Sequence, residues 1–348
     1  MKVLTPSTVF DLPAGAEASE PPERRGLSRD GGRLLVARPD GVSHHRFRNL
    51  PEVLMAGDLL VLNTSATLAA ALDGTDAGGV AVPVHVSTEL DDGSWVVELR
   101  LPGNTGPDLA RRRAESITLP GGVRVQLLEP YPDAAASSSR LWRARPVEVP
   151  SLVAYLAVHG KPIEYGYLHG RFPLADHQTV YAGEPGSAEM PSAGRPFTDR
   201  VLVRLIARGV TVVPLVLHTG VSSPELHEPP IPERFAVPAA TADAVNAALA
   251  GGRRIIAVGT TVVRALETIA GPDGRVRAAS GWTHTVISPD HPVRVVSGLI
   301  SGLHPPEASH LVMLEAVAGP RLVAGAYAAA LDHGYLWHEF GDSMLFLP

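Results

Sequence analysis

The chain has 348 residues, and since a folded domain averages about 150 residues, two domains are expected. Hydrophobic residues make up 45% and charged residues 19% of the chain, with a mean hydropathy of +0.10, which excludes a largely disordered protein. The 30 basic and 36 acidic residues give a formal charge of −6, which argues against a general binder of nucleic-acid phosphates. Cysteine is absent, so disulfides, thiolate nucleophiles, iron–sulfur clusters and cysteine zinc sites are excluded.

The start of the chain predicts a cytoplasmic protein. The first residues, MKVLTPSTVFDLP, contain no continuous apolar segment followed by a small-residue cleavage site, and polar residues, Gly or Pro interrupt every apolar run before it could span a membrane. We therefore expect no membrane partner.

The first 150 residues read as strands. Apolar runs at 33–37 and 58–63 predict two strands around a Pro-Asp-Gly turn. From about residue 66 to 150, short alternating segments such as VAVPVHV and SWVVELRL are separated by turn residues at intervals near ten. This spacing favours an antiparallel barrel or a small sandwich.

From residue 150 onward helices alternate with strands. Helices are predicted at 149–160, 197–210, 239–252, 261–270, 307–319 and 321–334, with Thr241 as a candidate cap, and strands at 211–218, 253–261 and 343–347. The pattern predicts an α/β fold of the mixed α+β type. Neither a GxxxxGK[ST] nor a GxGxxG motif is present, so ATP or NAD binding has no motif support.

The most informative segment is 257–264, Ala-Val-Gly-Thr-Thr-Val-Val-Arg. A buried strand there leads through Gly259, Thr260 and Thr261 directly into a helix. Unpaired N–H groups and the helix dipole at such a start attract anions, and Arg264, one turn further, can pair with a carboxylate. The alternative is an ordinary helix start with a surface arginine.

Three further residues lie where chemistry is expected. His218 ends a predicted strand, and His304 stands in a Gly-Leu-His-Pro-Pro turn that could hold an imidazole for proton transfer. Asp342 follows a glycine before the last strand. The alternatives are a core histidine, an exposed turn histidine and a turn acceptor.

Neither a metal site nor a nucleic-acid patch has strong support from the sequence. The fourteen histidines include no HExxH motif, so no metal is expected. The run Arg111-Arg112-Arg113 could contact phosphate, but a solvated face is the simpler interpretation.

The ordered set of these segments resembles the S-adenosylmethionine:tRNA ribosyltransferase-isomerase family of queuosine biosynthesis, over nearly the whole chain. The matching pieces are Phe10 to Pro13, Arg29-Asp30, 33–36, GDLLVLN ending at Asn63, 178–182 with Gln178 and Tyr181, the frame of Pro191, Ala193-Gly194 and Phe197-Thr198 around Ser192, Leu217-His218 with Gly220, 257–267, 281–283, His304 with Pro306, Met313-Leu314, Gly341-Asp342 and Met344-Leu345.

The resemblance implies a mixed α/β domain built from both chain ends, 1–65 and 151–348, with a small β-barrel domain inserted at 66–150. It also implies transfer of the ribosyl part of S-adenosylmethionine to 7-aminomethyl-7-deazaguanine in tRNA, with loss of adenine and methionine. S-adenosylmethionine would be a co-substrate and no prosthetic group would be needed, because the sulfonium acidifies the C5′ protons for a positioned base. A monomer or weak homodimer is expected.

The same resemblance suggests roles for the candidate residues. His218 or His304 would be base and acid, and Asp342 would bind the ribose hydroxyls or the amine. Gly259, Thr260, Thr261 and Arg264 would bind the methionine carboxylate. The remaining substrate-binding candidates are Glu267, Gln178, Tyr181, Ser192 and Phe197.

The chain departs from the family pattern at several charged positions. Thr64-Ser65-Ala66 and 69–71 replace two arginines and an acid, and Pro196 replaces a histidine. Three functions therefore stay open at this point: the family reaction on tRNA, cleavage of S-adenosylmethionine with a small-molecule acceptor, and an inactive relative that only binds.

Overall fold

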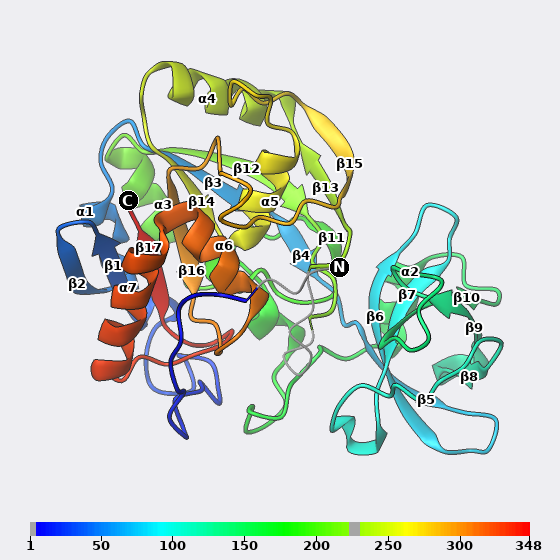
Figure 1. Ribbon diagram of the computed structural model, residues 1–348. Coiled ribbons are helices and arrows are strands. Elements are labelled where there is room, and N and C mark those ends of the chain that lie inside the picture. The colour runs from blue at the N-terminus through cyan, green and yellow to red at the C-terminus, as the bar shows by residue number, and fades with distance from the viewer. Residues whose placement is uncertain (1–4, 223–229) are drawn as a thin grey trace.

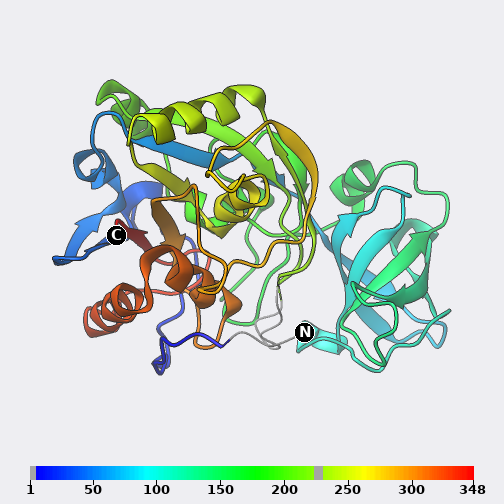
Figure 2. The ribbon, with the colours of Figure 1, turned by 45° about the horizontal axis from the view of Figure 1, so that its top comes forward.

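The computed structural model describes residues 5–222 and 230–348. Figure 1 shows a large sheet flanked by helices, with a barrel standing to one side of it. Figure 2, turned by 45°, shows the same two bodies side by side, joined by extended segments. The architecture is mixed α/β with an antiparallel barrel, so the predicted fold class is confirmed.

The large sheet has nine strands in the order β15-β13-β12-β3-β14-β16-β17-β1-β2. Parallel pairing joins β12, β3, β14 and β16 in its centre. On one side β13 and β15 follow with antiparallel pairing. On the other side β17 is antiparallel to β16, β1 is parallel to β17, and β2 is antiparallel to β1. In chain order the strands are β1 (Arg33–Arg38), β2 (Gly41–Arg46), β3 (Leu59–Asn63), β12 (Thr211–Leu217), β13 (Glu233–Val237), β14 (Ile255–Val258), β15 (Ala279–Thr283), β16 (Gly298–Gly302) and β17 (Ser343–Phe346).

Helices cover both faces of this sheet. The central strands β3 and β14 are buried along their whole length, and both are continuous apolar runs apart from Asn63 at the end of β3. Alternate residues of β1 face different cores: Leu35 packs in the cluster with α4 (Ala239–Ala250), α5 (Thr260–Thr268), α6 (Ser309–Ala318) and α7 (Pro320–Asp332). Leu34 packs in the cluster with α1 (Leu50–Val53) and α3 (Asp199–Ala207). The result is a three-layer body.

The barrel closes in the order β10-β7-β6-β5-β8-β9, with every neighbouring pair antiparallel. Its strands are β5 (Ala71–Thr75), β6 (Ala81–Glu89), β7 (Trp95–Leu99), β8 (Ser116–Thr118), β9 (Arg124–Pro130) and β10 (Leu141–Pro146). Helix α2 (Leu152–His159) packs against the barrel core, and the short parallel pair β4 (Ser65–Thr67) and β11 (Glu184–Ser187) lies where the two bodies join. The barrel strands fall inside the predicted insertion, whose boundaries at 66 and 150 stay a prediction.

Some local predictions were wrong. Thr241 does not cap α4: the helix begins after Pro238, and the Thr241 hydroxyl donates to the Pro214 carbonyl oxygen at 2.5 Å. Six strands outside the barrel were missed. The strands β2, β13 and β15 are short, partly polar strands at or next to the sheet edges and carry only a weak periodic signal. The central strand β16 has a glycine at each end and only three residues between them, and β4 and β11 have three and four residues, too few for a periodic pattern.

The parallel centre of the sheet positions the site. Strands β12, β14 and β16 run in the same direction, so their carboxyl ends meet at one edge. The segments that follow them begin at His218, Gly259 and Leu303. Ligand-binding groups in α/β sheets collect at such an edge.

Candidate active site

A cavity of about 290 Å³ opens at this edge, between the sheet, the start of α6 and the barrel side of the molecule. Its walls come from the loops after β12, β14 and β16, and from residues of the barrel and of the segments beside it. The lining residues used below are Arg140, Tyr165, Tyr167, Glu189, Ser192, Thr219, Gly220, Glu233, Gly259, Thr260, Thr261, Arg264, Ser301, His304, His310, His338 and Glu339.

The predicted helix start forms one wall of this cavity. Buried β14 ends at Val258, and Gly259 follows with φ of +91°, a left-handed conformation that favours glycine. Helix α5 then begins directly at Thr260, and both Thr260 and Thr261 line the cavity. The amino end of the helix therefore presents partial positive charge to a ligand.

Arg264 lies one turn into α5 and is only 3% exposed. Its Nε donates to the Thr285 carbonyl oxygen at 3.1 Å, its Nη2 donates to that of Ile231 at 3.0 Å, and its Nη1 pairs with Glu233. Burial raises the pKa of Glu233, and Arg264 opposes that shift. A guanidinium has five N–H donors, and these contacts use three of them. One unused N–H donor therefore remains on each of the two terminal nitrogens.

His304 lies on the same cavity. Its Nε2 is 2.9 Å from Ser301 Oγ, and its ring stacks on that of His310 with centroids 4.5 Å apart. Its backbone is fixed by Tyr327, whose hydroxyl accepts its N–H at 3.1 Å. Burial, and secondarily the neighbouring His310, hold the pKa of His304 well below the usual range, so the ring is neutral at neutral pH.

His218 does not line the cavity, although Thr219 and Gly220 directly after it do. Its Nδ1 is 2.7 Å from Ser65 Oγ, and the Ser65 hydroxyl is in turn 2.6 Å from that of Ser187. A Cβ at Gly186 would lie 2.4 Å from the ring, so only glycine leaves room for it. Burial lowers the pKa of His218.

The other predicted residues also divide into those that line the cavity and those that do not. Ser192 lines the cavity, whereas the rest make contacts inside the protein. Gln178 pairs with the backbone of Thr67, accepting at 2.9 Å and donating at 2.7 Å. Glu267 accepts the backbone N–H groups of Arg294, Val295 and Val296. Tyr181 and Phe197 pack edge to face with ring centroids 6.0 Å apart, and Asp342 binds the Arg33 side chain and backbone.

Several cavity residues were missed from the sequence, among them Glu233, His310 and His338, and four more form two hydrogen-bonded pairs. The Tyr165 hydroxyl donates to Glu189, and that of Tyr167 donates to Glu339. Desolvation raises the pKa of Glu189 to about 7. The four residues are scattered along the chain and match no motif; the one available signal was that Glu189 lies two residues before the Pro191 frame.

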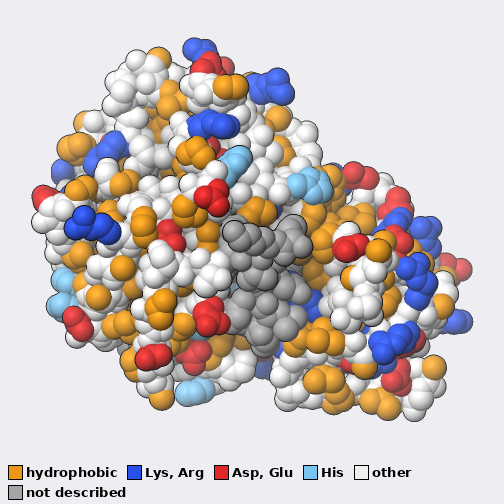
Figure 3. Space-filling model, viewed as in Figure 1, with side chains coloured by type: hydrophobic (Ala, Val, Ile, Leu, Met, Phe, Trp, Pro, Cys, Tyr) orange, Lys and Arg blue, Asp and Glu red, His pale blue; other side chains and the backbone are white. Residues whose placement is uncertain are grey.

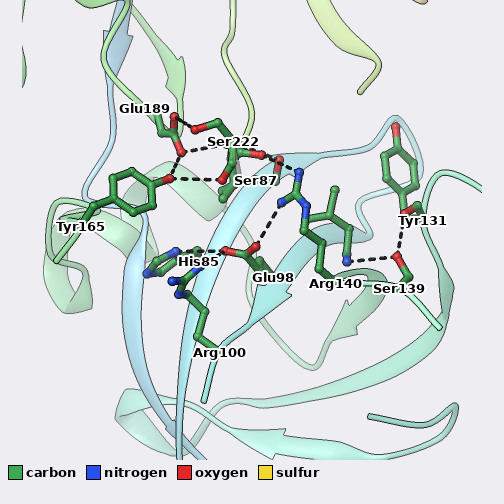
Figure 4. Close-up of polar contacts among 12 residues, drawn as sticks. His85, Ser87, Glu98, Arg100, Tyr131, Ser139, Arg140, Tyr165, Glu189 and Ser222 are labelled. Atoms are coloured by element: carbon green, nitrogen blue, oxygen red, sulfur yellow. Dashed lines mark hydrogen bonds and ion pairs between the residues drawn. The ribbon is translucent and has the colours of Figure 1, made fainter. Parts of the chain in front are cut away.

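A buried ionic cluster in the barrel lies next to Tyr165 and Glu189 (Figure 4). Glu98 is 3.1 Å from both Arg100 and Arg140 and 3.4 Å from His85. Arg140 also donates to the Val221 carbonyl oxygen at 3.2 Å. The barrel thus binds the loop that follows β12, and the loop borders the cavity.

Two of the three arginines in the basic run of the barrel pair with acidic residues, while the Arg112 side chain donates to backbone carbonyl oxygens. Arg111 lies 2.7 Å from Asp108 and 3.3 Å from Glu115, and Arg113 lies 3.9 Å from Glu129. On the face seen in Figure 3, basic and acidic side chains are interspersed over the barrel. This face gives no support to a phosphate-binding role for the run.

The described residues show neither a metal-binding cluster nor a single membrane-spanning helix. They contain no group of three or more His, Asp or Glu residues arranged to hold a metal ion. No single helix among them is long and apolar enough to cross a bilayer. Helices α6 and α7 reach that length and apolar composition only when they are counted together, across a bend of 119°.

Comparisons with known proteins agree with this arrangement. A family model described as "Queuosine biosynthesis protein" matches residues 6–346. The S-adenosylmethionine:tRNA ribosyltransferase-isomerase of Moorella thermoacetica is 34% identical, over 97% of this chain and 98% of that protein. The protein of the same name from Thermus thermophilus is 36% identical, with coverage of 92% and 93%. The crystal structure of S-adenosylmethionine tRNA ribosyltransferase from Thermotoga maritima has a TM-score of 0.54 at 27% identity, covering 98% of this chain and 99% of that one.

Proposed function

The chain belongs to the queuosine biosynthesis protein family, and from this premise we propose that it is an S-adenosylmethionine:tRNA ribosyltransferase-isomerase. The reaction moves the ribosyl part of S-adenosylmethionine to 7-aminomethyl-7-deazaguanine in tRNA and releases adenine and methionine. The observation that carries the proposal is that one cavity brings together the start of α5 with Arg264, predicted as one segment, and His304, predicted separately from it.

The start of α5 is the site for the methionine part of S-adenosylmethionine. The donor carboxylate would accept N–H groups of the first helical turn and the two remaining N–H donors of Arg264. Glu233, held against Arg264, then faces the α-ammonium group, which is one carbon away from that carboxylate.

His304 is the base that this geometry favours for the C5′ proton. It lies on the cavity and is unprotonated at neutral pH, whereas His218 lies behind Ser65 and Ser187. Removal of a C5′ proton beside the positive sulfur is followed by departure of adenine. His218 is then a positioning residue for β4 and β11.

The remaining predicted ligands support the walls of the cavity. Asp342 fixes β1 through Arg33, Gln178 fixes β4 through Thr67, and Glu267 fixes the segment before β16. We propose that the protein acts on its tRNA in the cytoplasm, as a monomer or weak homodimer.

The test is to incubate the pure protein with S-adenosylmethionine, with and without tRNA that carries 7-aminomethyl-7-deazaguanine, and to quantify adenine and methionine. Release in equal amounts and only with that tRNA is expected. Release at the same rate without tRNA would overturn the tRNA acceptor and indicate a small-molecule or hydrolytic reaction. An absence of release, with donor binding intact by calorimetry, would indicate a relative that only binds.

A further inference from the structure

A carboxyl group on the cavity has no role in the reaction as described so far. Glu189 follows β11 and borders the cavity with its side chain (Figure 4). Its Oε1 accepts the Tyr165 hydroxyl and the Ser222 backbone N–H at 2.8 Å, and its Oε2 accepts the Ser222 hydroxyl at 2.8 Å.

These contacts orient the carboxyl group without satisfying it. A carboxylate oxygen accepts two hydrogen bonds, so Oε1 is saturated while Oε2 retains one acceptor position. The donors that reach it from Tyr165 and Ser222 are neutral, which leaves its negative charge without a counter-ion among these contacts. A ligand that brings a positive N–H donor would supply both missing partners.

A second carboxyl lies on the same side of the cavity. Glu339 accepts the Tyr167 hydroxyl, and the rings of Tyr165 and Tyr167 are stacked with centroids 6.1 Å apart. Glu339 contributes to raising the pKa of Glu189, so the two negative charges are close enough to repel each other. A cation between them would remove that repulsion.

The substrates of the proposed reaction contain three positive groups. The sulfonium carries no proton and cannot donate a hydrogen bond. The α-ammonium of the donor follows its carboxylate to Arg264 and Glu233, at the start of α5. The primary ammonium of the aminomethyl group on the acceptor base is left, and it must lose a proton before its nitrogen can act as a nucleophile.

We propose that Glu189 binds the primary ammonium of the acceptor through Oε2 and takes one of its protons, with Tyr165 and Ser222 positioning the carboxylate. This inference rests on the function proposed above and assigns a further catalytic residue to that site. One N–H bond breaks and its electron pair stays on nitrogen, which becomes a neutral amine. One O–H bond forms on Glu189, and its carboxylate changes from a charge of −1 to a neutral carboxylic acid.

The environment of Glu189 suits this step. Among the described residues, the charged or titratable groups on the same side of the cavity are Tyr165, Tyr167, Glu339, His338 and Arg140. Arg140 is held by Glu98 and the Val221 carbonyl, and both tyrosine hydroxyls have pKa values raised by burial, so they stay neutral donors. A Glu189 pKa of about 7 allows the group to accept and release a proton at neutral pH.

The experiment compares wild type with Glu189→Gln, Glu189→Asp and the matched control Glu89→Gln. Glu89 is exposed at the end of β6 in the barrel. For each protein, S-adenosylmethionine affinity is measured by calorimetry, and single-turnover ribosyl transfer to tRNA is followed from about pH 5.5 to about pH 9.

For wild type we expect the single-turnover rate to increase with pH, so that the pH–rate profile has a rising limb near pH 7, because Glu189 must be ionised to take the proton. Glu189→Gln should lose roughly two to four orders of magnitude in rate, together with this limb. Glu189→Asp should recover part of the rate and keep the limb, and Glu89→Gln should match wild type. Donor affinity should stay within about twofold of wild type, since a tenfold change would require about 1.4 kcal/mol.

Three results would overturn the inference. The first is a Glu189→Gln variant that keeps the wild-type limb, and the second is a tenfold loss of donor affinity, which would assign Glu189 to the donor ammonium. The third needs no variant: wild type should bind tRNA with 7-methyl-7-deazaguanine more weakly than tRNA with the aminomethyl base, and equal binding contradicts the proposal. Failure of wild type to transfer ribosyl to tRNA would instead contradict the proposed function.

Discussion

Replacement of Arg264 by Gln tests whether α5 holds the carboxylate of the donor. In the structure Arg264 has one N–H left on each terminal nitrogen, after its contacts with Thr285, Ile231 and Glu233. A hydrogen bond to a charged group contributes about 1.5–3 kcal/mol. Since each 1.4 kcal/mol is about tenfold in affinity, Arg264→Gln should weaken S-adenosylmethionine binding roughly 10- to 150-fold, measured by calorimetry.

The same change also removes the counter-ion of Glu233, so stability and binding have to be separated. Loss of one member of a buried pair costs about 3 kcal/mol, and the Glu233 side chain is only 13% exposed. A double variant, Arg264→Gln with Glu233→Gln, removes the unpaired charge and should regain most of that stability while donor binding stays weak. Arg277→Gln, at an exposed position, is the matched control. Donor affinity within threefold of wild type in Arg264→Gln would refute the assignment of the carboxylate.

Three further results follow from the site and the barrel. His304→Ala should lower adenine release by roughly two to four orders of magnitude, whereas His218→Ala should lower it less than about tenfold; the reverse order would assign the base to His218. Because burial keeps the pKa of His304 well below its usual range, exchange of the donor C5′ proton with solvent, without acceptor, should be constant from about pH 7 to about pH 9; an increase centred above pH 7 would contradict this. Glu98→Ala should lower the free energy of unfolding by about 3–5 kcal/mol, because two buried arginines lose this carboxylate. Urea unfolding followed by tryptophan fluorescence measures the change, and a loss below about 1 kcal/mol would show that the cluster is dispensable.

The parts of the site that were predicted share a local signal. Gly259 and the two threonines stand between a buried apolar run and an amphipathic helix, so strand, turn and helix start are visible within twelve residues of sequence. His304 has a similar signal, because glycine and prolines around it define a turn. Both lie at carboxyl ends of strands that turned out to be parallel neighbours.

The parts that were not predicted depend on contacts between distant segments. Tyr165 and Glu189 are 24 residues apart, and Ser222 lies 57 residues from Tyr165. Apart from the position of Glu189 just before the Pro191 frame, nothing in their local pattern distinguishes them from surface residues, since their environment is made by packing of the barrel side against the sheet. The same limit explains why Glu267 was taken for a ligand: its segment matched, but only the fold shows that its carboxylate accepts three backbone N–H groups.

The most direct test of the central claim follows the ribose carbons. The protein is incubated with S-adenosylmethionine labelled in the ribose and with tRNA that carries 7-aminomethyl-7-deazaguanine, and the label recovered in tRNA is compared with the adenine released. The account predicts one labelled ribosyl group in tRNA for each adenine and each methionine released, and no label in tRNA when the methionine or the adenine part carries it. Release of adenine while the ribose label stays off the tRNA would contradict it.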